Sequence, residues 1–200
     1  MEQNQISNAT SINRYPHLFH EIKSIIPHPN QILSFGCSTG EECITLHNFY
    51  FPGTKIIGLD INQQIIKSNI IKNQHKNIQY YSELENINNK SDLIFANSVL
   101  CKWPEVVGEY TFETFEKTIE QIDNLLNEDG YLCIYNSKYL FTETQLFKNK
   151  YEIVITRHTD TGFVTKYHSN NNPITEKYPF YLFKKTTFRK SCDKKLINNF

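Results

Sequence analysis

Short apolar runs alternate with amphipathic stretches over the first two thirds of the chain. The pattern predicts strands at 32–35, 55–59, 78–81, 92–96 and 131–135, and helices at 41–50, 62–74 and 112–126. A further amphipathic helix, with apolar residues spaced from Tyr15 to Ile26, precedes the first strand and ends before Pro27. Strands that are separated by helices favour a parallel sheet with right-handed crossovers, so we expect an α/β fold.

The pattern changes after Asn136. Two apolar runs, 151–155 and 178–183, flank a polar stretch that is rich in Asn, Thr and His. We expect these runs to pair as antiparallel strands at the edge of the sheet, without another helical crossover. The segment 157–177 between them is long for a connection in a compact domain, and we expect it to form part of a substrate mouth.

The composition suits one domain. Of the 200 residues, 39% are hydrophobic, and no stretch rich in Gly, Pro or Ser indicates a linker. We expect an N-terminal extension with its helix at 1–30, a ligand-binding domain at 31–188 and a basic tail at 189–200. The 21 Lys and Arg residues balance 21 Asp and Glu residues, and this zero net charge disfavours nucleic acid as a partner.

The apolar runs and the cysteines of the chain indicate the cellular compartment in which we expect the protein. Residues 1–13 lack the apolar core of a signal peptide, and no apolar run approaches the roughly 20 residues of a membrane-spanning helix. The five cysteines include no C-x-x-C pair, which argues against a disulfide framework and a structural zinc site. We therefore expect a cytoplasmic protein with no metal site and no membrane association. Its oligomeric state is not specified by the sequence.

The segment ILSFGCSTGEE, which ends at Glu42, indicates a ligand-binding loop. An apolar strand leads into Gly36 and Gly40, which permit a tight turn and a close approach of the backbone to a ligand. Glu41 and Glu42 follow at a helix start, where they would repel a phosphate but suit a ligand with an ammonium and a sulfonium group. S-adenosylmethionine fits this description. The alternative is an ordinary turn whose acids interact favourably with the helix dipole.

A further acid stands where a ribose diol would lie. The buried run 54–59 ends in Asp60, which is followed by Ile61. We favour ribose binding by Asp60, and capping of the helix near Asn62 is the alternative. A nicotinamide dinucleotide would require G-x-G-x-x-G, whereas this loop offers only G-x-x-x-G.

Polar residues also follow the third and fourth predicted strands. They are Ser82 and Glu83 after the third strand, and Asn97 and Ser98 after the fourth. Ligands of parallel sheets lie beyond the carboxyl ends of the strands, so both junctions are candidate contacts. A solvated turn and a capping role are the respective alternatives.

With these features in this order, and an Asp-Gly turn before the fifth strand, the chain resembles the class I S-adenosylmethionine-dependent methyltransferases over nearly its full length. The resemblance implies a single Rossmann-like, three-layer α/β/α domain. Its seven-stranded sheet would be mostly parallel with an antiparallel last strand. Residues 37–42, 92–95 and 99–100 are also similar to cofactor motifs of the chemotaxis-receptor methyltransferases, which esterify glutamates. That similarity covers the cofactor half only.

The resemblance implies a set of donor-binding residues: Ser34, Gly36, Cys37, Ser38, Gly40, Glu41, Asp60, Ile61, Ser82, Glu83, Asn97 and Ser98. The family commonly places an acid two residues before the first glycine, where this chain has Ser34. The ammonium of the donor then needs another partner, and we assign it to Glu41, which is the matching position in the motif of the chemotaxis-receptor methyltransferases. The family commonly contacts adenine in the region of Ser82 and Glu83.

Several residues outside this set are further candidates. Arg14 and Tyr15 precede the first helix, where surface placement is favoured over a lid across the donor. Trp103 is interpreted either as the lining of an acceptor pocket or as a core or lid aromatic residue. The late polar segment contains three candidate acid–base groups: His158, Asp160 and His168.

These features together predict an S-adenosylmethionine-dependent methyltransferase that acts on a small molecule or a protein. Methyl transfer depends mainly on alignment and exclusion of water, so we assign no catalytic residue. Two alternatives remain open. One is a non-catalytic binding module of the same fold, motivated by Ser34, and the other is a nicotinamide-dependent oxidoreductase.

Overall fold

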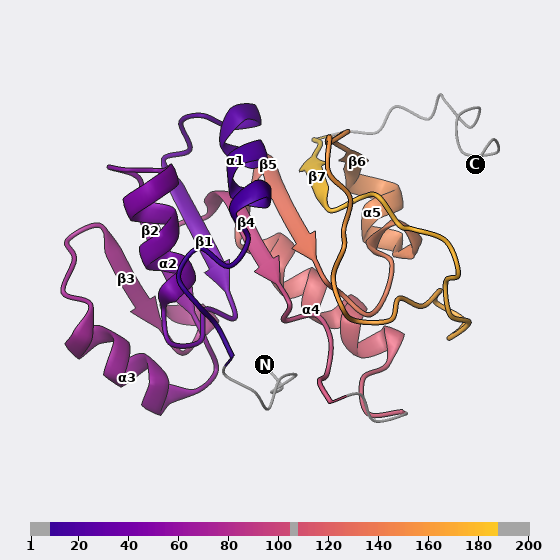
Figure 1. Ribbon diagram of the computed structural model, residues 1–200, viewed down its shortest axis with the longest axis horizontal. Coiled ribbons are helices and arrows are strands. Elements are labelled where there is room, and N and C mark those ends of the chain that lie inside the picture. Colours follow the sequence, from indigo (N-terminus) through magenta and orange to yellow (C-terminus); the bar gives the residue numbers. More distant parts are fainter. Residues whose placement is uncertain (1–8, 105–107, 188–200) are drawn as a thin grey trace.

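The computed structural model describes residues 9–104 and 108–187, and within them the chain builds one seven-stranded sheet (Figure 1). The strands are β1 Gln31–Phe35, β2 Lys55–Leu59, β3 Ile78–Tyr81, β4 Ser91–Asn97, β5 Leu126–Tyr135, β6 Tyr151–Ile153 and β7 Leu182–Lys185. Their spatial order is β3-β2-β1-β4-β5-β7-β6. Strand β7 is antiparallel to both of its neighbours and all other pairs are parallel, which confirms the expected fold class.

Helices connect the strands at nearly all of the predicted positions. They are α1 Pro16–Ile25, α2 Glu41–Thr45, α3 Gln63–Lys72, α4 Phe112–Asn124 and α5 Gln145–Lys150, with a π-helical turn η1 Leu46–Tyr50 and short 3-10 turns at η2 Leu84–Asn86 and η3 Phe141–Glu143. The helix starts follow local chemistry. Pro16 begins α1, where its missing N–H costs nothing, and the Asn62 side chain accepts hydrogen bonds from the first turn of α3.

Two hydrophobic clusters hold the helices against opposite faces of the sheet. Alternate residues of each strand point to opposite faces, so neighbours in β1 enter different clusters: Ile32 one and Leu33 the other. Helices α1, α2 and α3 cover the Ile32 face, and α4 and α5 cover the Leu33 face (Figure 1). The result is the three-layer α/β/α arrangement, in which the carboxyl ends of the parallel strands meet at one edge.

The part of the chain after Asn136 agrees with the sequence pattern only in part. Strands β6 and β7 pair in antiparallel fashion at the sheet edge as predicted, and β7 lies between β5 and β6. No helix lies between β6 and β7, as expected, whereas α5, which precedes β6, was not predicted. This helix has six residues and buries one, Phe147, which is too short a stretch for an amphipathic period to show in the sequence.

The start of one strand differs from its predicted position, and the predicted domain boundaries are not tested by the structure. Strand β5 begins at Leu126 instead of residue 131, with a register shift opposite β4 and a positive φ of 61° at Asp129. The predicted basic tail, 189–200, lies outside the described residues, and the domain boundaries at 30 and 188 stay predictions. Among the described residues, no helix is long and apolar enough to cross a membrane.

Candidate functional site

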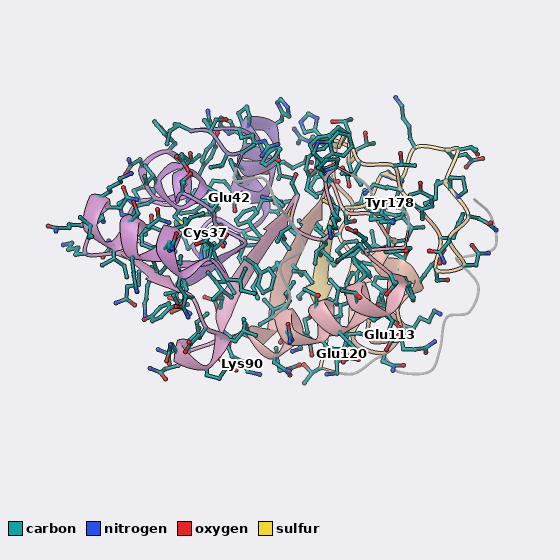
Figure 2. The ribbon with its side chains drawn as sticks, turned by 90° about the horizontal axis from the view of Figure 1, so that it is seen from below. Cys37, Glu42, Lys90, Glu113, Glu120 and Tyr178 are labelled. Carbon is teal, nitrogen blue, oxygen red and sulfur yellow. The ribbon has the colours of Figure 1, made fainter. Side chains whose placement is uncertain are left out.

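A cavity of about 280 Å³ opens at the carboxyl ends of β1, β2 and β4. Its lining comes from the segment before α1, helices α1, α2 and α4, the β1–α2 loop, the ends of β1, β2 and β4, the loop between β4 and α4, and the segment between β6 and β7. The lining residues are Ala9, Thr10, Ser11, Arg14, Tyr15, Phe19, Phe35, Gly36, Cys37, Ser38, Glu42, Thr45, Leu59, Asp60, Ile61, Asn97, Ser98, Val99, Trp103, Thr118, Gln121 and Phe163. Figure 2 views the molecule from below Figure 1 and shows Cys37 and Glu42 near each other in its amino-terminal half.

The β1–α2 loop makes a turn that depends on glycine. Gly36 and Gly40 have φ values of +78° and +89°, a backbone region that favours glycine. A Cβ atom at Gly36 would also lie 2.5 Å from Cγ2 of Val99, which follows β4. The Gly36 and Cys37 amides donate to the Leu59 carbonyl oxygen at 2.8 and 2.9 Å, and this ties the turn to the end of β2.

Glu42 places a carboxylate in the cavity from the first turn of α2. Ser34 Oγ donates to Glu42 Oε1 at 2.7 Å, and Asn97 Nδ2 donates to Glu42 Oε2 at 2.8 Å. Burial raises the pKa of Glu42, although these two hydrogen bonds and the nearby Arg14 guanidinium act in the opposite direction. A positively charged ligand group beside Glu42 would favour its ionised form. The local chemistry therefore suits a cation.

Asp60 both braces the glycine loop and lines the cavity. Its Oδ2 accepts from the Ser38 amide at 2.9 Å, and its Oδ1 accepts from the Asn62 amide at 2.9 Å. Each carboxylate oxygen has a second lone pair, so these bonds leave acceptor capacity for the hydroxyls of a ribose. The capping and ligand-binding interpretations of Asp60 are thus compatible.

The segment before α1 lies over the cavity. The favoured surface placement is confirmed for Arg14, which is exposed although it lines the cavity, and was wrong for Tyr15, which is half-buried. Tyr15 Oη lies 2.8 Å from Ser98 Oγ at the end of β4, and its ring is 5.2 Å from that of Tyr135. The Arg14 guanidinium lies 5.1 Å from the Tyr15 ring centre. These partners come from strands far away in the sequence, and no local pattern indicated them.

Seven of the predicted donor-binding residues line the cavity: Gly36, Cys37, Ser38, Asp60, Ile61, Asn97 and Ser98. Five do not. Ser34 lies behind Glu42, and Gly40 precedes α2 beside Tyr80. The others are Glu41, whose Oε2 accepts from Thr39 Oγ1, and Ser82 and Glu83, which follow β3.

Sequence reasoning did not name Phe163, which lines the cavity, and it did not favour a ligand-site role for Tyr15. It named both acids of the loop but assigned the ligand to Glu41. Successive helical residues point about 100° apart, so only one of two adjacent acids can face the cavity. One feature of the sequence could have indicated Glu42 as the acid in the cavity. The small side chain of Ser34 leaves room beside it for a carboxylate from the following helix.

The late polar segment contributes an aromatic residue to the cavity and no base. The backbone amide of His158 donates to Glu21, His168 Nδ1 lies 2.5 Å from Glu143 Oε1, and Asp160 is buried in an ion pair with Lys166 at 2.6 Å. None of these three candidate acid–base groups lines the cavity, whereas Phe163 does. Among the described residues, no group of three or more His, Cys, Asp or Glu side chains is arranged to hold a metal ion.

The strand order, the antiparallel β7 and a carboxylate-lined cavity at the ends of β1, β2 and β4 define a Rossmann-like nucleoside-binding domain of the methyltransferase type. The sequence model of a family described as a methyltransferase domain matches residues 29–176. The chain belongs to this methyltransferase domain family. The interpretation as an oxidoreductase is therefore set aside.

The chain is also similar to solved structures at low sequence identity. A ribosomal protein L11 methylase from Lactobacillus delbrueckii subsp. bulgaricus is 18% identical with a TM-score of 0.54, over 91% of this chain and 82% of that one. PKMT2 from Rickettsia typhi is 21% identical with a TM-score of 0.41, over 52% of this chain and 20% of that one. Human N-acetylserotonin methyltransferase is 16% identical with a TM-score of 0.42, over 52% and 28%.

The chain thus spans only a small part of the length of some structures that it matches. These likenesses concern the fold alone. No curated protein matches the chain. The local similarity to chemotaxis-receptor methyltransferases stays a prediction.

Proposed function

We propose that this protein transfers the methyl group of S-adenosylmethionine to an acceptor bound beside the end of β4, with Glu42 as the partner of the donor's ammonium group. The observation that carries the proposal is the Glu42 carboxylate, which lines the cavity and is held there by two hydrogen bonds. It forms no ion pair with any side chain in the described part of the chain. Asp60 would accept hydrogen bonds from the ribose hydroxyls. This assignment replaces the expected role of Glu41.

The remaining donor-binding residues support the proposal by their positions. Gly36, Cys37 and Ser38 present the loop backbone to the cavity, and Asn97 and Ser98 border its β4 side. The Asp60 amide donates to the Tyr81 carbonyl at 3.1 Å, so an adenine ring extending beyond the ribose would approach the end of β3. On this basis we retain Ser82 and Glu83, which follow that strand, as proposed contacts of the adenine.

Methyl transfer requires the protein mainly to align the donor with the acceptor and to exclude water. When bound, S-adenosylmethionine supplies a methyl carbon on a positive sulfur, and transfer breaks this bond with its electron pair left on sulfur while the acceptor's lone pair forms the new bond. Tyr15 and the segment before α1 cover the cavity and would shield the reaction from water. We propose small molecules or proteins as acceptors, and a net charge of zero disfavours nucleic acid.

We also propose that the protein works in a reducing cytoplasm. Its described cysteines, Cys37, Cys43, Cys101 and Cys133, are buried as free thiols. Burial raises the pKa of the Cys37 and Cys133 thiols, which keeps them protonated and unreactive. Cysteines of this kind contribute to packing and do not need an oxidising compartment.

The test is binding of S-adenosylhomocysteine followed by transfer of a labelled methyl group. Ligand at 100 times its Kd stabilises a native protein by about 2.7 kcal/mol, and we expect a rise in Tm of about 5 °C or more. Asp60→Ala should lose this rise, and Glu176→Ala, an exposed acid away from the cavity, should keep it. A rise with NAD but not with S-adenosylhomocysteine would contradict the proposal. Donor binding without transfer of label to any cell fraction would favour a non-catalytic module.

A further inference from the structure

We propose that Trp103 and Phe163 bind the methyl acceptor between or against their rings, and that the acceptor carries a planar, uncharged aromatic group. This inference rests on the proposed function, because it assigns the acceptor side of the same cavity. Both rings line the cavity, one from the loop after β4 and one from the segment between β6 and β7. Their contact joins two loops that are distant in the sequence.

The two rings leave a large apolar surface uncovered. Trp103 is 46% exposed and Phe163 is 55% exposed, although each touches the other with ring centres 5.2 Å apart and planes at 79°. Exposed aromatic rings at the rim of a cavity with polar groups deeper inside are typical of ligand sites. A planar ligand ring would bury this surface and gain the edge-to-face or offset contacts that aromatic rings prefer.

The segment that carries Phe163 is held rigidly. Asp160 accepts hydrogen bonds from the Gly162 amide at 2.9 Å and from the Asn136 amide at 3.0 Å. Asn136 Oδ1 in turn accepts from the Val164 amide at 2.9 Å. A Cβ atom at Gly162 would lie 2.2 Å from Asn136 Oδ1, so the segment can approach this closely only with glycine. Phe163 therefore lies in a turn whose conformation is fixed by these hydrogen bonds.

Asn136 also links this turn to the donor side of the cavity. Its Nδ2 donates to Ser98 Oγ at 2.7 Å, and Ser98 Oγ lies 2.8 Å from Tyr15 Oη. Asn136 itself is buried. One buried amide thus positions both the turn of Phe163 and the hydroxyl pair at the end of β4. A ring bound at Trp103 and Phe163 would lie next to that polar end of the cavity.

The charges around the aromatic pair argue for an uncharged acceptor. Lys102, the neighbour of Trp103, forms an ion pair with Glu109, and Lys166 forms one with Asp160. The charged side chains among the described lining residues are Arg14, Glu42 and Asp60, and the last two are assigned to the donor. The remaining one, Arg14, interacts electrostatically with Glu42 and lowers its pKa. A charged acceptor would therefore lose hydration at the rings without gaining an opposite charge that is not already engaged.

The experiment uses Trp103, which is the single tryptophan of the chain, as its own reporter. Fluorescence is excited at the red edge of tryptophan absorption while the full-length protein is titrated with benzyl alcohol, with and without saturating S-adenosylhomocysteine. Cyclohexylmethanol is the saturated probe of similar size, and benzoate is the charged aromatic probe. We expect a saturable change with benzyl alcohol and about fivefold or more weaker binding of the other two probes.

Three variants separate the aromatic site from general effects. Phe163→Leu should weaken benzyl alcohol binding about fivefold, and Phe163→Tyr should restore it because the ring is kept. Phe49→Leu is the matched control, since Phe49 is 61% exposed and does not line the cavity. Each variant is first shown to bind S-adenosylhomocysteine by calorimetry as tightly as the wild type, which verifies its fold.

The outcomes distinguish this inference from the proposed function. If S-adenosylhomocysteine binds but benzyl alcohol does not saturate, or binds no better than cyclohexylmethanol or benzoate, the aromatic acceptor site is overturned and donor binding stands. An unchanged affinity in Phe163→Leu also overturns it. If S-adenosylhomocysteine does not bind the wild type at all, the proposed function and the acceptor role fail together. Labelled methyl transfer to a protein, with no transfer to neutral aromatic compounds, likewise overturns the inference.

Discussion

The hydroxyl of Ser34 donates a 2.7 Å hydrogen bond to Oε1 of Glu42, so a serine on β1 holds a carboxylate that comes from helix α2. Class I relatives commonly carry an acid at the position of Ser34 itself. Here the small serine side chain leaves room for Glu42, and Asn97 on β4 holds the second carboxylate oxygen at 2.8 Å. The negative charge thus reaches the cavity from a different element of the fold.

Replacing Glu42 by glutamine should weaken binding of S-adenosylhomocysteine by about 10- to 100-fold. The substitution keeps the shape but removes the charge, and a hydrogen bond to a charged group contributes about 1.5–3 kcal/mol. Isothermal titration calorimetry measures the effect. Glu41→Gln is the matched control, since its side chain accepts from Thr39 and does not line the cavity. A larger loss in Glu41→Gln than in Glu42→Gln would reinstate the assignment of the ammonium to Glu41.

Donor affinity should fall at acidic pH because of the same carboxylate. Burial raises the pKa of Glu42 above its ordinary value, and only the ionised form pairs with an ammonium group. As the pH falls through this raised pKa, the affinity for S-adenosylhomocysteine should decrease in the wild type. Calorimetry over a pH series should show a much flatter profile for Glu42→Gln. Parallel profiles for the two proteins would mean that another group controls the pH dependence.

Stability of the unliganded protein should depend on this group with the opposite sign. A raised pKa in the folded state means that the native protein holds the proton more tightly than the unfolded chain. The stabilising contribution is complete below the ordinary pKa of glutamate and is lost as the pH rises through the raised value. We therefore expect unliganded Glu42→Gln to melt at a higher temperature than the wild type near neutral pH. This difference should shrink on acidification, and a lower Tm at neutral pH would contradict it.

Gly36→Ala should destabilise the protein and weaken donor binding. The new Cβ would meet Val99 Cγ2 at 2.5 Å, and the φ of +78° is unfavourable for alanine, with a typical strain of about 1–3 kcal/mol. Urea denaturation measures the loss of stability. The double variant Gly36→Ala, Val99→Ala should recover only part of it, because it removes the methyl groups in contact but neither the 2.9 Å approach to Val99 Cβ nor the backbone strain. Full recovery would show that the clash alone matters.

Asp123→Asn should cost about 3–5 kcal/mol of stability. Asp123 on α4 accepts from Tyr151 Oη at 2.7 Å and pairs with the buried Lys185 of β7 at 2.9 Å. Burial alone would raise the pKa of Asp123, but the hydrogen bonds from Tyr151, Lys185 and Lys150 lower it overall. Without this carboxylate the buried Lys185 ammonium would lose its nearest charge and keep only the half-exposed Glu128, 3.2 Å away.

Urea denaturation near neutral pH tests this prediction about the sheet edge. The control is Glu113→Gln, because Glu113 forms an exposed ion pair with Lys117 on the same helix and should have little effect on stability. Since the pKa of Asp123 is lowered in the folded state, its stabilising contribution is present above the ordinary pKa of aspartate and is lost as the pH falls through the lowered value. A loss in Asp123→Asn no greater than in the control would contradict the argument.

The order of strands and helices and the glycine turn followed from the sequence because they depend on neighbouring residues. Periodicity predicted β1 to β5 and four of the helices, and positive φ values occur at both loop glycines. The antiparallel edge pair was also visible as two apolar runs. Helix α5 was not visible, because six residues with one buried side chain carry no clear period.

Local sequence therefore determined the framework of this protein and the carboxylates near its cofactor loop, since strand length, helix period and turn chemistry are set within a few residues. The tertiary structure decided which side chains face the cavity. It selected Glu42 over Glu41, placed Tyr15 against Ser98, and brought Phe163 to Trp103. These choices depend on the order in which strands pair and on the angle at which each helix packs, and both arise from contacts between residues far apart in the chain.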